Sequence, residues 1–250
     1  MATITFPSDP AREQERLDAL AGYNILDTAP EESFDRLTRL ARRLFGVEMS
    51  TISFLDAHRQ WFKSRQGFDA FETDRDSAFC NIAIQQPKPL IVQDATKDET
   101  FAQNRFVTGE PHVRFYAGFQ RRSPDGYAIG TLCAFDPRPR TFSDDDHQTL
   151  ADLGGLAGEL LALRRRIAEK EAPAKDAANH RVLKAGRIVY GKLAMPCTIR
   201  ALTAEAATVD VLSTNKIPER VALMIDTDAV SRLCQITART DRQLMLAFES

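Results

Sequence analysis

The feature that most constrains the fold is a break in the hydrophobic pattern at residues 171–180, EAPAKDAANH, which have no periodicity and contain Pro173. Before the break, helical periodicity is mixed with alternating strands, whereas after it only short apolar runs follow, roughly ten residues apart. Aperiodic sequence with a proline is typical of a linker, and 250 residues suffice for two domains that each have a core. We therefore expect a tail at 1–11, a first domain at 12–170, a linker at 171–178 and a second domain at 179–250.

The composition limits the cellular compartments and the classes of partner that suit this chain. A net charge of −2 gives no basic field for general nucleic-acid binding, and no apolar run approaches the ~20 residues that a membrane helix needs. The first residues lack the basic segment and apolar core of a secretory signal. Four cysteines stand far apart without a Cys-x-x-Cys pair, which argues against a disulfide framework or a zinc site: Cys80, Cys133, Cys197 and Cys234. We expect a cytoplasmic protein with no nucleic-acid partner, no membrane partner and no metal.

Helices and strands alternate in the first domain, and the strongest strand signal is a hairpin at 114–136. Its turn, Ser-Pro-Asp-Gly at 123–126, combines residues that favour tight turns. Pairing Ser123 with Gly126 places Phe115, Ala117, Phe119 and Arg121 on one face, opposite Ala134, Leu132, Gly130 and Ala128. Arg121 at the end of this apolar face indicates an anionic ligand, a subunit contact or a solvated strand end. The other expected elements are helices at 12–22, 31–45 and 78–86 and strands at 49–55, 60–67 and 89–93.

The last helix of the first domain carries a dimerisation pattern. Ser143 can cap it, and three aspartates follow at its positive end. Apolar residues then recur at steps of three and four, which suits a short coiled-coil contact in a homodimer: Leu153, Leu156, Leu160, Leu163 and Ile167. The alternative is a single helix that packs on the sheet of its own domain.

Residues ~12–165 resemble a GAF domain of the type found in bacterial sensor proteins. The resemblance is carried in order by "ERLDALAGYNILDTAPEESFDRLTRLARRLFGV", "DAHRQWFKS", "RDSAFCNIAI", "VQDATKDETFAQNRFVTGEPHVRFYAGF" and "FSDDDHQTLADL". It implies a central antiparallel sheet with helices on one side and a ligand pocket on the other. The sequence departs from this GAF type at Ile82, where a histidine is usual, and at Gln120 and Arg121, where Pro-Leu is usual.

Four residues are candidates for the GAF ligand site: Trp61, Cys80, Tyr116 and Arg121. Core packing is the alternative for the aromatic ones. Some GAF-type proteins reduce free methionine sulfoxide with cysteine thiolates, and such a thiol needs a lowered pKa. Cys80 can open a helix and is the better redox candidate, whereas Cys133 lies in an apolar strand and is expected to be a core side chain. The absence of a paired resolving cysteine counts against thiol chemistry.

The second domain is expected to be a small β-barrel, because six short strands follow at regular spacing. Residues ~179–250 resemble a PilZ domain, a six-stranded barrel that often binds cyclic di-GMP through paired arginines and an [Asp/Asn]-x-Ser-x-x-Gly stretch. Both motifs are altered: Lys184 and Arg187 follow Arg181, and "ALTAEA" places Ala201, Thr203 and Ala206 in the second motif. The remaining candidate ligands are Arg181, Lys184, Arg187 and Thr203.

The sequence indicates a signalling protein rather than an enzyme. It contains no nucleophile–base pair, metal cluster or Gly-rich phosphate loop, so we predict no catalytic residues and assign no cofactor. The predicted fold class is α+β, with a GAF domain followed by a PilZ-like barrel. We expect a GAF sensor and dimerisation module coupled to a barrel that contacts a protein partner in a signalling pathway. The alternatives are a cyclic di-GMP effector that binds through the barrel and, third, a thiol-based redox sensor or methionine sulfoxide reductase-like protein.

Overall fold

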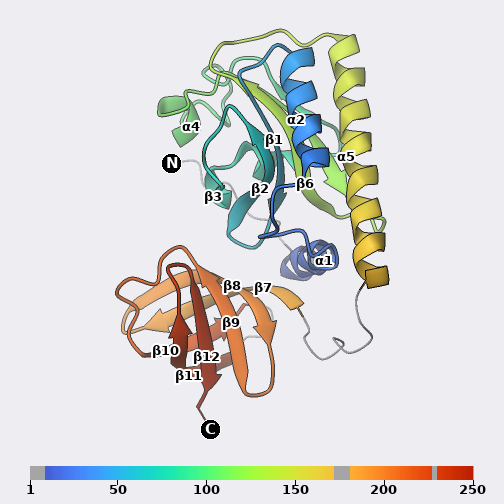
Figure 1. Ribbon diagram of the computed structural model, residues 1–250. Helices are drawn as coiled ribbons and strands as arrows, with labels where there is room; N and C mark the ends of the chain where they lie inside the picture. Colours follow the sequence, from blue (N-terminus) through green and yellow to red (C-terminus); the bar gives the residue numbers. More distant parts are fainter. Residues whose placement is uncertain (1–8, 172–180, 227–229, 250) are drawn as a thin grey trace. The chain divides into compact units, whose positions relative to one another are not determined.

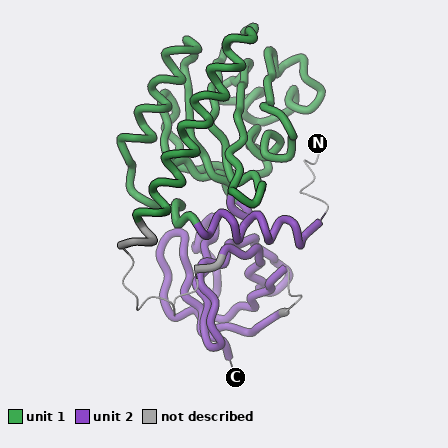
Figure 2. The backbone as a smooth tube through the Cα atoms, turned by 90° about the vertical axis from the view of Figure 1, so that its right-hand side faces the viewer, with its two compact units in different colours: residues 1–8, 23–55, 59–171 green, residues 9–22, 56–58, 172–250 purple. Residues whose placement is uncertain are grey.

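The computed structural model describes residues 9–171, 181–226 and 230–249, and its contacts divide them into two compact units (Figure 1). Unit 1 contains residues 23–55 and 59–171, and unit 2 contains residues 9–22, 56–58, 181–226 and 230–249 (Figure 2). Residues 12–22, which the sequence analysis assigned to the first domain, therefore group with the barrel. The predicted tail, except 9–11, and the predicted linker, except Glu171, lie outside the described residues.

Unit 1 is built on an antiparallel sheet of six strands in the order β3-β2-β1-β6-β5-β4. Its central strands β1 and β6 are buried along their whole length, so the sheet is covered on both faces. The strands are β1 (Met49–Leu55), β2 (Arg59–Gln66), β3 (Glu72–Asp74), β4 (Leu90–Val92), β5 (Phe115–Arg122) and β6 (Ala128–Asp136). The antiparallel sheet expected for the first domain is confirmed.

Helices cover the two faces of this sheet unequally. The long helices α2 (Glu32–Leu44) and α5 (Asp144–Glu171) lie side by side on one face (Figure 1). The short helix α3 (Phe79–Ala83) packs against β1, β5 and β6 on the other face, and α4 (Arg105–Thr108) follows in the same part of the chain. The predicted cap of α5 is confirmed, because Ser143 Oγ accepts from Asp146 N at 3.1 Å while Asp146 Oδ2 accepts from Ser143 N at 2.9 Å. Among the described residues, no helix is both long enough and apolar enough to cross a membrane.

The β5–β6 hairpin forms, but its register differs from the predicted one by two residues. Ser123 N bonds to Tyr127 O, which leaves a three-residue loop whose Gly126 has φ +89°. A bulge between Arg121 and Arg122 then shifts the pairing again, so that Arg121 lies opposite Gly130 rather than Ala128. The two shifts of one residue each add up to two residues. The side chains therefore keep their predicted faces, while their cross-strand partners change.

The strands of unit 2 close into a six-stranded barrel in the order β10-β11-β12-β9-β8-β7, as the sequence analysis expected. The strands are β7 (Arg181–Tyr190), β8 (Leu193–Leu202), β9 (Ala206–Val211), β10 (Arg220–Ile225), β11 (Val230–Arg239) and β12 (Gln243–Phe248). Alternate side chains of β9, β10 and β12 fill the interior, and closure pairs every strand edge. Helix α1 (Pro10–Ala21) also belongs to unit 2 and contacts β7.

Candidate functional site

A small cavity lies between α3 and the sheet of unit 1. The cavity has a free volume of about 40 Å³, whereas one water needs roughly 10–15 Å³, so the space holds a molecule of two or three heavy atoms. Most of the lining is aromatic or aliphatic. Its polar members come from β1, β2, β3, α3, β5 and β6: Thr51, Gln60, Thr73, Cys80, Tyr116 and Cys133.

Two thiols meet at this cavity. Cys80 lies on α3 and Cys133 on β6, and their Sγ atoms are 3.3 Å apart with both side chains buried. The expectation that Cys80 has no cysteine partner is therefore wrong. It failed because 53 residues separate the two positions along the chain, and only the packing of α3 on the sheet brings them together.

Hydrogen-bond donors converge on the Cys80 sulfur. Gln60 Nε2 donates to it at 3.2 Å, Tyr116 Oη at 3.3 Å and Ser53 Oγ at 3.6 Å. Cys133 Sγ lies 3.0 Å from Thr131 Oγ1 and 3.3 Å from the Cys80 sulfur, and Thr131 Oγ1 shares a hydrogen bond with Ser53 Oγ. A thiol sulfur is a weak acceptor and a thiolate a strong one, so this arrangement suits a thiolate at Cys80.

The two thiols differ in their ionisation. Burial raises the pKa of Cys80, but hydrogen bonds from Cys133, Thr131, Tyr116 and Ser53 outweigh it and lower that pKa to about 6. Burial and the neighbouring Cys80 sulfur both raise the pKa of Cys133 well above its ordinary value. Burial also raises the pKa of Tyr116, which therefore stays a donor. The pair loses its first proton from Cys80 and holds the second at Cys133.

Gly118 makes room for the tyrosine of this cluster. Tyr116 and Gly118 lie on the same face of β5, and a Cβ at Gly118 would lie 2.3 Å from Tyr116 Oη. Because Gly118 has no Cβ, the Tyr116 phenol occupies this space and reaches both sulfurs, at 3.3 Å from Cys80 and 3.2 Å from Cys133. Gln120, on the same face again, donates to Ala83 O at 3.0 Å and thereby ties β5 to the end of α3.

Only two of the four predicted GAF ligand residues, Cys80 and Tyr116, line the cavity. Trp61 is buried but does not line it, whereas its neighbours Gln60 and Phe62 do, because successive side chains of β2 point to opposite faces. Arg121 likewise points away from the cavity, to the face of β5 that α5 covers. A Cβ at Gly158 of α5 would lie 1.8 Å from Arg121 Nη1, so the guanidinium occupies the space above that glycine.

The glycine spacing on α5 is a signal that the sequence analysis missed. Gly154 and Gly158 are one helical turn apart, and the Cβ atom that Gly154 lacks would lie 2.2 Å from Phe119 Cδ1. Phe119 and Arg121 of β5 thus fit into a groove on α5. Arg121 Nε is buried there without a hydrogen-bond partner among the described residues.

The predicted dimerisation residues of α5 divide into two groups. Leu153 is 5% exposed and packs inside unit 1, so its assignment to an intersubunit contact is wrong in this fold. Leu160 is half-buried. Leu156, Leu163 and Ile167 are 48%, 54% and 46% exposed, which leaves an apolar stripe along α5.

The predicted ligand residues of the barrel do not form one cluster. The Arg181 side chain lies outside the described part of the chain, and its backbone pairs with Ala201. Arg187 is six residues further along β7, about 20 Å away, and its Nε bonds to Asp226 at 3.2 Å. Lys184 lies between them and is half-buried. Thr203 Oγ1 accepts from Ala206 N at 3.0 Å and so serves the β8–β9 turn.

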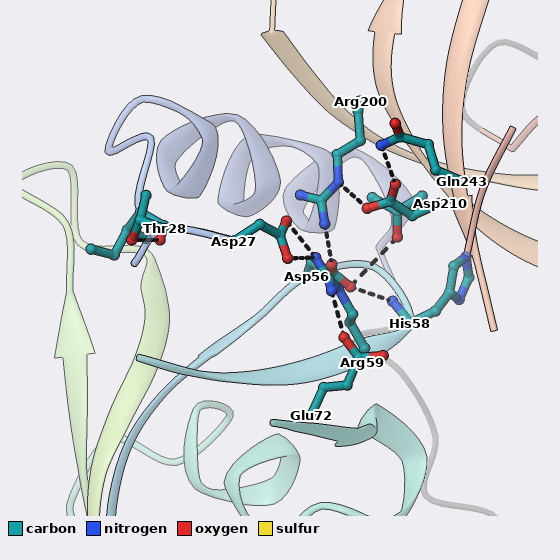
Figure 3. A network of polar contacts seen from close by, with 11 residues as sticks. Asp27, Thr28, Asp56, His58, Arg59, Glu72, Arg200, Asp210 and Gln243 are labelled. Atoms are coloured by element: carbon teal, nitrogen blue, oxygen red, sulfur yellow. Dashed lines mark hydrogen bonds and ion pairs between the residues drawn. The ribbon is translucent and has the colours of Figure 1, made fainter. Parts of the chain in front are cut away.

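Polar side chains of the barrel instead form a network around Arg200 (Figure 3). Arg200 Nε bonds to Asp210 at 2.6 Å, and Gln243 donates to the other oxygen of that carboxylate at 2.9 Å. Within unit 2, Arg200 also reaches the buried Asp56 at 3.3 Å. Separately, in unit 1, Arg59 joins Asp27 and Glu72 at 2.8 and 2.6 Å (Figure 3). Among residues 9–171, 181–226 and 230–249, no group of three or more His, Cys, Asp or Glu side chains could hold a metal ion.

The chain is similar over part of its length to a known protein. A cyclic di-GMP phosphodiesterase of Pseudomonas aeruginosa is 37% identical over 140 residues, which are 56% of this chain and 23% of that protein. The chain therefore spans under a quarter of that relative's length.

Solved structures with a similar fold also match. A domain of a two-component sensor histidine kinase protein from Sinorhizobium meliloti has 18% identity and a TM-score of 0.48, covering 58% of this chain and 100% of its own. A free methionine-R-sulfoxide reductase from Neisseria meningitidis has 14% identity and a TM-score of 0.46, covering 67% and 99%. The GAF domain model matches residues 29–161, more than half of the chain, and the chain therefore belongs to the GAF domain family.

Proposed function

We propose that this chain is a non-catalytic signalling protein in which the GAF domain is the input and dimerisation module and the barrel is a protein-interaction output. The observation that carries the proposal is the extent of the similarity. The relative named as a cyclic di-GMP phosphodiesterase shares this chain's GAF segment, and the match covers 23% of that relative. Here the GAF domain precedes a closed barrel in the same chain. The similarity to a protein named as a cyclic di-GMP phosphodiesterase supports a role in cyclic di-GMP signalling.

The contacts of β5 support a structural connection between the cavity and α5. On β5, Tyr116 faces the cavity, whereas Phe119 and Arg121 pack into the groove at Gly154 and Gly158. The two faces of one strand thus contact the cavity and the long helix. A change that shifts β5 at the cavity is expected to shift α5, and α5 is the last element before the barrel in the chain.

The apolar stripe on α5 supports homodimerisation. Leu156, Leu163 and Ile167 are about half exposed, and Leu40 and Leu44 of the neighbouring α2 are exposed as well. Apolar side chains that gather on adjacent helices mark a protein contact. A second copy that presents the same stripe would bury both.

The outer surface of the barrel supports a partner contact. Met224 on β10 and Leu233 on β11 are large exposed apolar residues, and Ala222 lies directly opposite Leu233 in the β10–β11 pair. These three side chains form one apolar patch on the outside of two adjacent strands. Arg187 and Arg200, two of the barrel's described arginines, already bind carboxylates of the barrel, which favours a protein over an anionic nucleotide as the partner at these positions.

The test compares partner capture by three forms of the full chain, in lysate of the cells that make it. Met224→Asp with Leu233→Asp removes the patch, and Gln235→Glu, also exposed on β11, is the matched control. We expect one protein retained by the wild type and the control and lost with the double variant. Equal capture by all three would refute the barrel as the output surface. Turnover of cyclic di-GMP by the purified wild type would refute the non-catalytic role.

The name of the relative favours a second candidate, a cyclic di-GMP effector that binds through the barrel. Arg187 is half exposed, and a phosphate would have to displace Asp226 from it. Calorimetric titration of the full chain with cyclic di-GMP tests this candidate, with Arg181→Ala and Arg187→Ala as site variants and Arg220→Ala as the control. Micromolar binding lost only in the site variants supports it, and absence of heat at high protein concentration retires it.

A further inference from the structure

The thiol pair of the GAF cavity is chemistry that the proposed input and output roles do not use. A disulfide has a sulfur–sulfur bond of 2.03–2.05 Å, and the Sγ atoms of Cys80 and Cys133 are 3.3 Å apart, so they must approach by only about 1.3 Å. Cys80 lies on the five-residue helix α3 and Cys133 on the central strand β6. A small movement of a short helix against a rigid sheet would suffice to join them.

We propose that Cys80 and Cys133 form a reversible disulfide inside the cavity when a small hydroperoxide, such as hydrogen peroxide, reaches them. The inference goes beyond the proposed signalling function, because it depends on the GAF cavity alone and not on the barrel.

The size and lining of the cavity select the reagent. Both cysteines are at most 3% exposed and both line the cavity, whose space of about 40 Å³ holds a molecule of two or three heavy atoms. Hydrogen peroxide has the size and hydrogen-bonding character of two waters, and it is uncharged.

Hydrogen bonding assigns different roles to the two sulfurs. Cys80 accepts from Gln60, Tyr116 and Ser53, so negative charge is better stabilised there than at Cys133. Cys133, whose thiol lies within hydrogen-bond distance of the Cys80 sulfur and of Thr131 Oγ1, keeps its proton until the second step. Cys80 is therefore the attacking thiolate and Cys133 the resolving thiol.

The reaction balances with one peroxide. The Cys80 thiolate attacks one peroxide oxygen, a sulfur–oxygen bond forms, the oxygen–oxygen bond breaks, and the departing hydroxide takes up a proton as water. The Cys133 sulfur then attacks the sulfur of the resulting sulfenic acid. A sulfur–sulfur bond forms, the sulfur–oxygen bond breaks, and the hydroxyl leaves as water with the Cys133 proton. Two thiols and one hydrogen peroxide give one disulfide and two waters, and an external dithiol reverses the change by exchange.

The other two cysteines provide a matched control. Cys197 and Cys234 are buried in the barrel, and burial raises the pKa of each above its ordinary value. A thiol whose pKa is raised in this way is a poor nucleophile, whereas hydrogen bonds lower the pKa of Cys80. The double variant Cys197→Ser with Cys234→Ser therefore removes half of the thiols without touching the GAF pair.

The experiment counts thiols in the full chain. Dithiol-reduced protein receives one equivalent of hydrogen peroxide, is denatured, and is labelled with a maleimide that adds a resolvable mass to each free cysteine. We expect the labelled sites to fall from four to two in the wild type and from two to none in the control variant, with Cys80 joined to Cys133 in the non-reduced peptide map. Retention of all four free thiols, or a disulfide between other cysteines, would overturn the inference.

Two further variants test the assigned roles. In Cys133→Ser, a sulfenic acid should persist at Cys80 and be trapped when the oxidised protein is unfolded in the presence of dimedone, whereas trapping elsewhere contradicts the assignment. Tyr116→Phe keeps both thiols but removes one donor to Cys80, so disulfide formation at neutral pH should slow about fivefold and its pH profile should move upward. An unchanged rate and profile in Tyr116→Phe, with the thermal transition retained, would refute the thiolate at Cys80 even if the Cys133 variant fails to fold.

Discussion

At the scale of single residues, the site depends on a missing side chain as much as on those present. Gly118 is the residue between Ala117 and Phe119 on β5, and the phenol of Tyr116 occupies the space that a Cβ at Gly118 would take. Tyr116 in turn bonds to the sulfur atoms of both cavity cysteines. The hydrogen bonding around Cys80 is thus set by the backbone position of a glycine.

Gly118→Ala should therefore disturb the cavity and weaken the fold. The added methyl would lie 2.3 Å from Tyr116 Oη and 2.7 Å from Tyr116 Cζ, so the ring has to move. Overpacking of this kind destabilises by about 1–3 kcal/mol, which urea denaturation of the full chain measures. A variant as stable as the wild type would show that Tyr116 has another place to go. Gly155→Ala, where nothing lies within 4 Å of the new Cβ, is the control.

Asp136 gives unit 1 a defined response to acid. Its carboxylate is fully buried and accepts from Glu48 N at 3.0 Å, Arg138 Nε at 3.0 Å and Arg140 Nη2 at 2.8 Å. Burial acts to raise the pKa of Asp136, but the hydrogen bonds from Arg138, Arg140 and Glu48 outweigh it and lower that pKa below the ordinary 3.8. The carboxylate's contribution to stability is therefore present above pH ~4 and is lost as the pH falls through the lowered native value.

Asp136→Asn should lower the free energy of unfolding by about 2 kcal/mol at pH 7, since the arginines lose a charged acceptor. The difference from wild type should shrink below pH 4, because acid removes the same interaction from the wild type. Urea denaturation between pH 7 and pH 3 measures both effects. Asp125→Asn, in the exposed hairpin turn, should follow the wild type throughout. A difference that does not change with pH would contradict the role of the ionised carboxylate.

At the scale of elements, two neighbouring glycines of α5 differ in their surroundings, and only one of them contacts β5. Gly154 faces β5, and a Cβ there would lie 2.2 Å from the ring of Phe119. Gly155 faces solvent, with nothing within 4 Å of its Cβ position. Gly154→Ala and Gly155→Ala should therefore change the stability of the fold in opposite directions.

Gly154→Ala should destabilise by about 1–3 kcal/mol, because Phe119 and α5 have to separate. Gly155→Ala should stabilise by roughly 0.5–1 kcal/mol, because alanine restricts the unfolded chain and favours the helix. Thermal or urea denaturation of the two variants measures the difference. Effects of the same sign would mean that α5 does not contact β5 through this groove.

The elements themselves could be read from the sequence, whereas their contacts could not. Hydrophobic periodicity indicated α2, α5 and the six barrel strands, and the Ser-Pro-Asp-Gly turn indicated the hairpin. The hairpin register failed, since a bulge and a three-residue loop both depend on the fit to neighbouring strands. The Cys80–Cys133 pair gave no sequence signal, because a helix and a strand meet there. By contrast, the spacing of Gly154 and Gly158 on α5 can be seen in the sequence, and two glycines one helical turn apart indicate close packing against the helix.

At the scale of the whole molecule, the two units are interleaved along the chain. Helix α1 and residues 56–58 belong to unit 2, although the sequence of unit 1 surrounds or follows them. Hydrophobic periodicity showed that residues 12–22 form a helix, but an amphipathic pattern does not specify which domain covers its apolar face. The assignment of that helix to the first domain rested on sequence order, whereas grouping by contacts follows the packing of α1 on β7.

The proposed homodimer belongs to this scale and has a direct test. Leu163→Asp with Ile167→Asp places two charges on the exposed stripe of α5, where burial against a second copy would leave them unpaired. We expect light scattering after size exclusion to give twice the chain mass for the wild type and the monomer mass for the variant. Glu159→Gln, exposed on the same helix, should remain dimeric. Both positions are about half exposed in the single chain, so the variant should keep its thermal transition. A wild type that is monomeric at high concentration, or a double variant that is still dimeric, would show that the stripe serves a different contact.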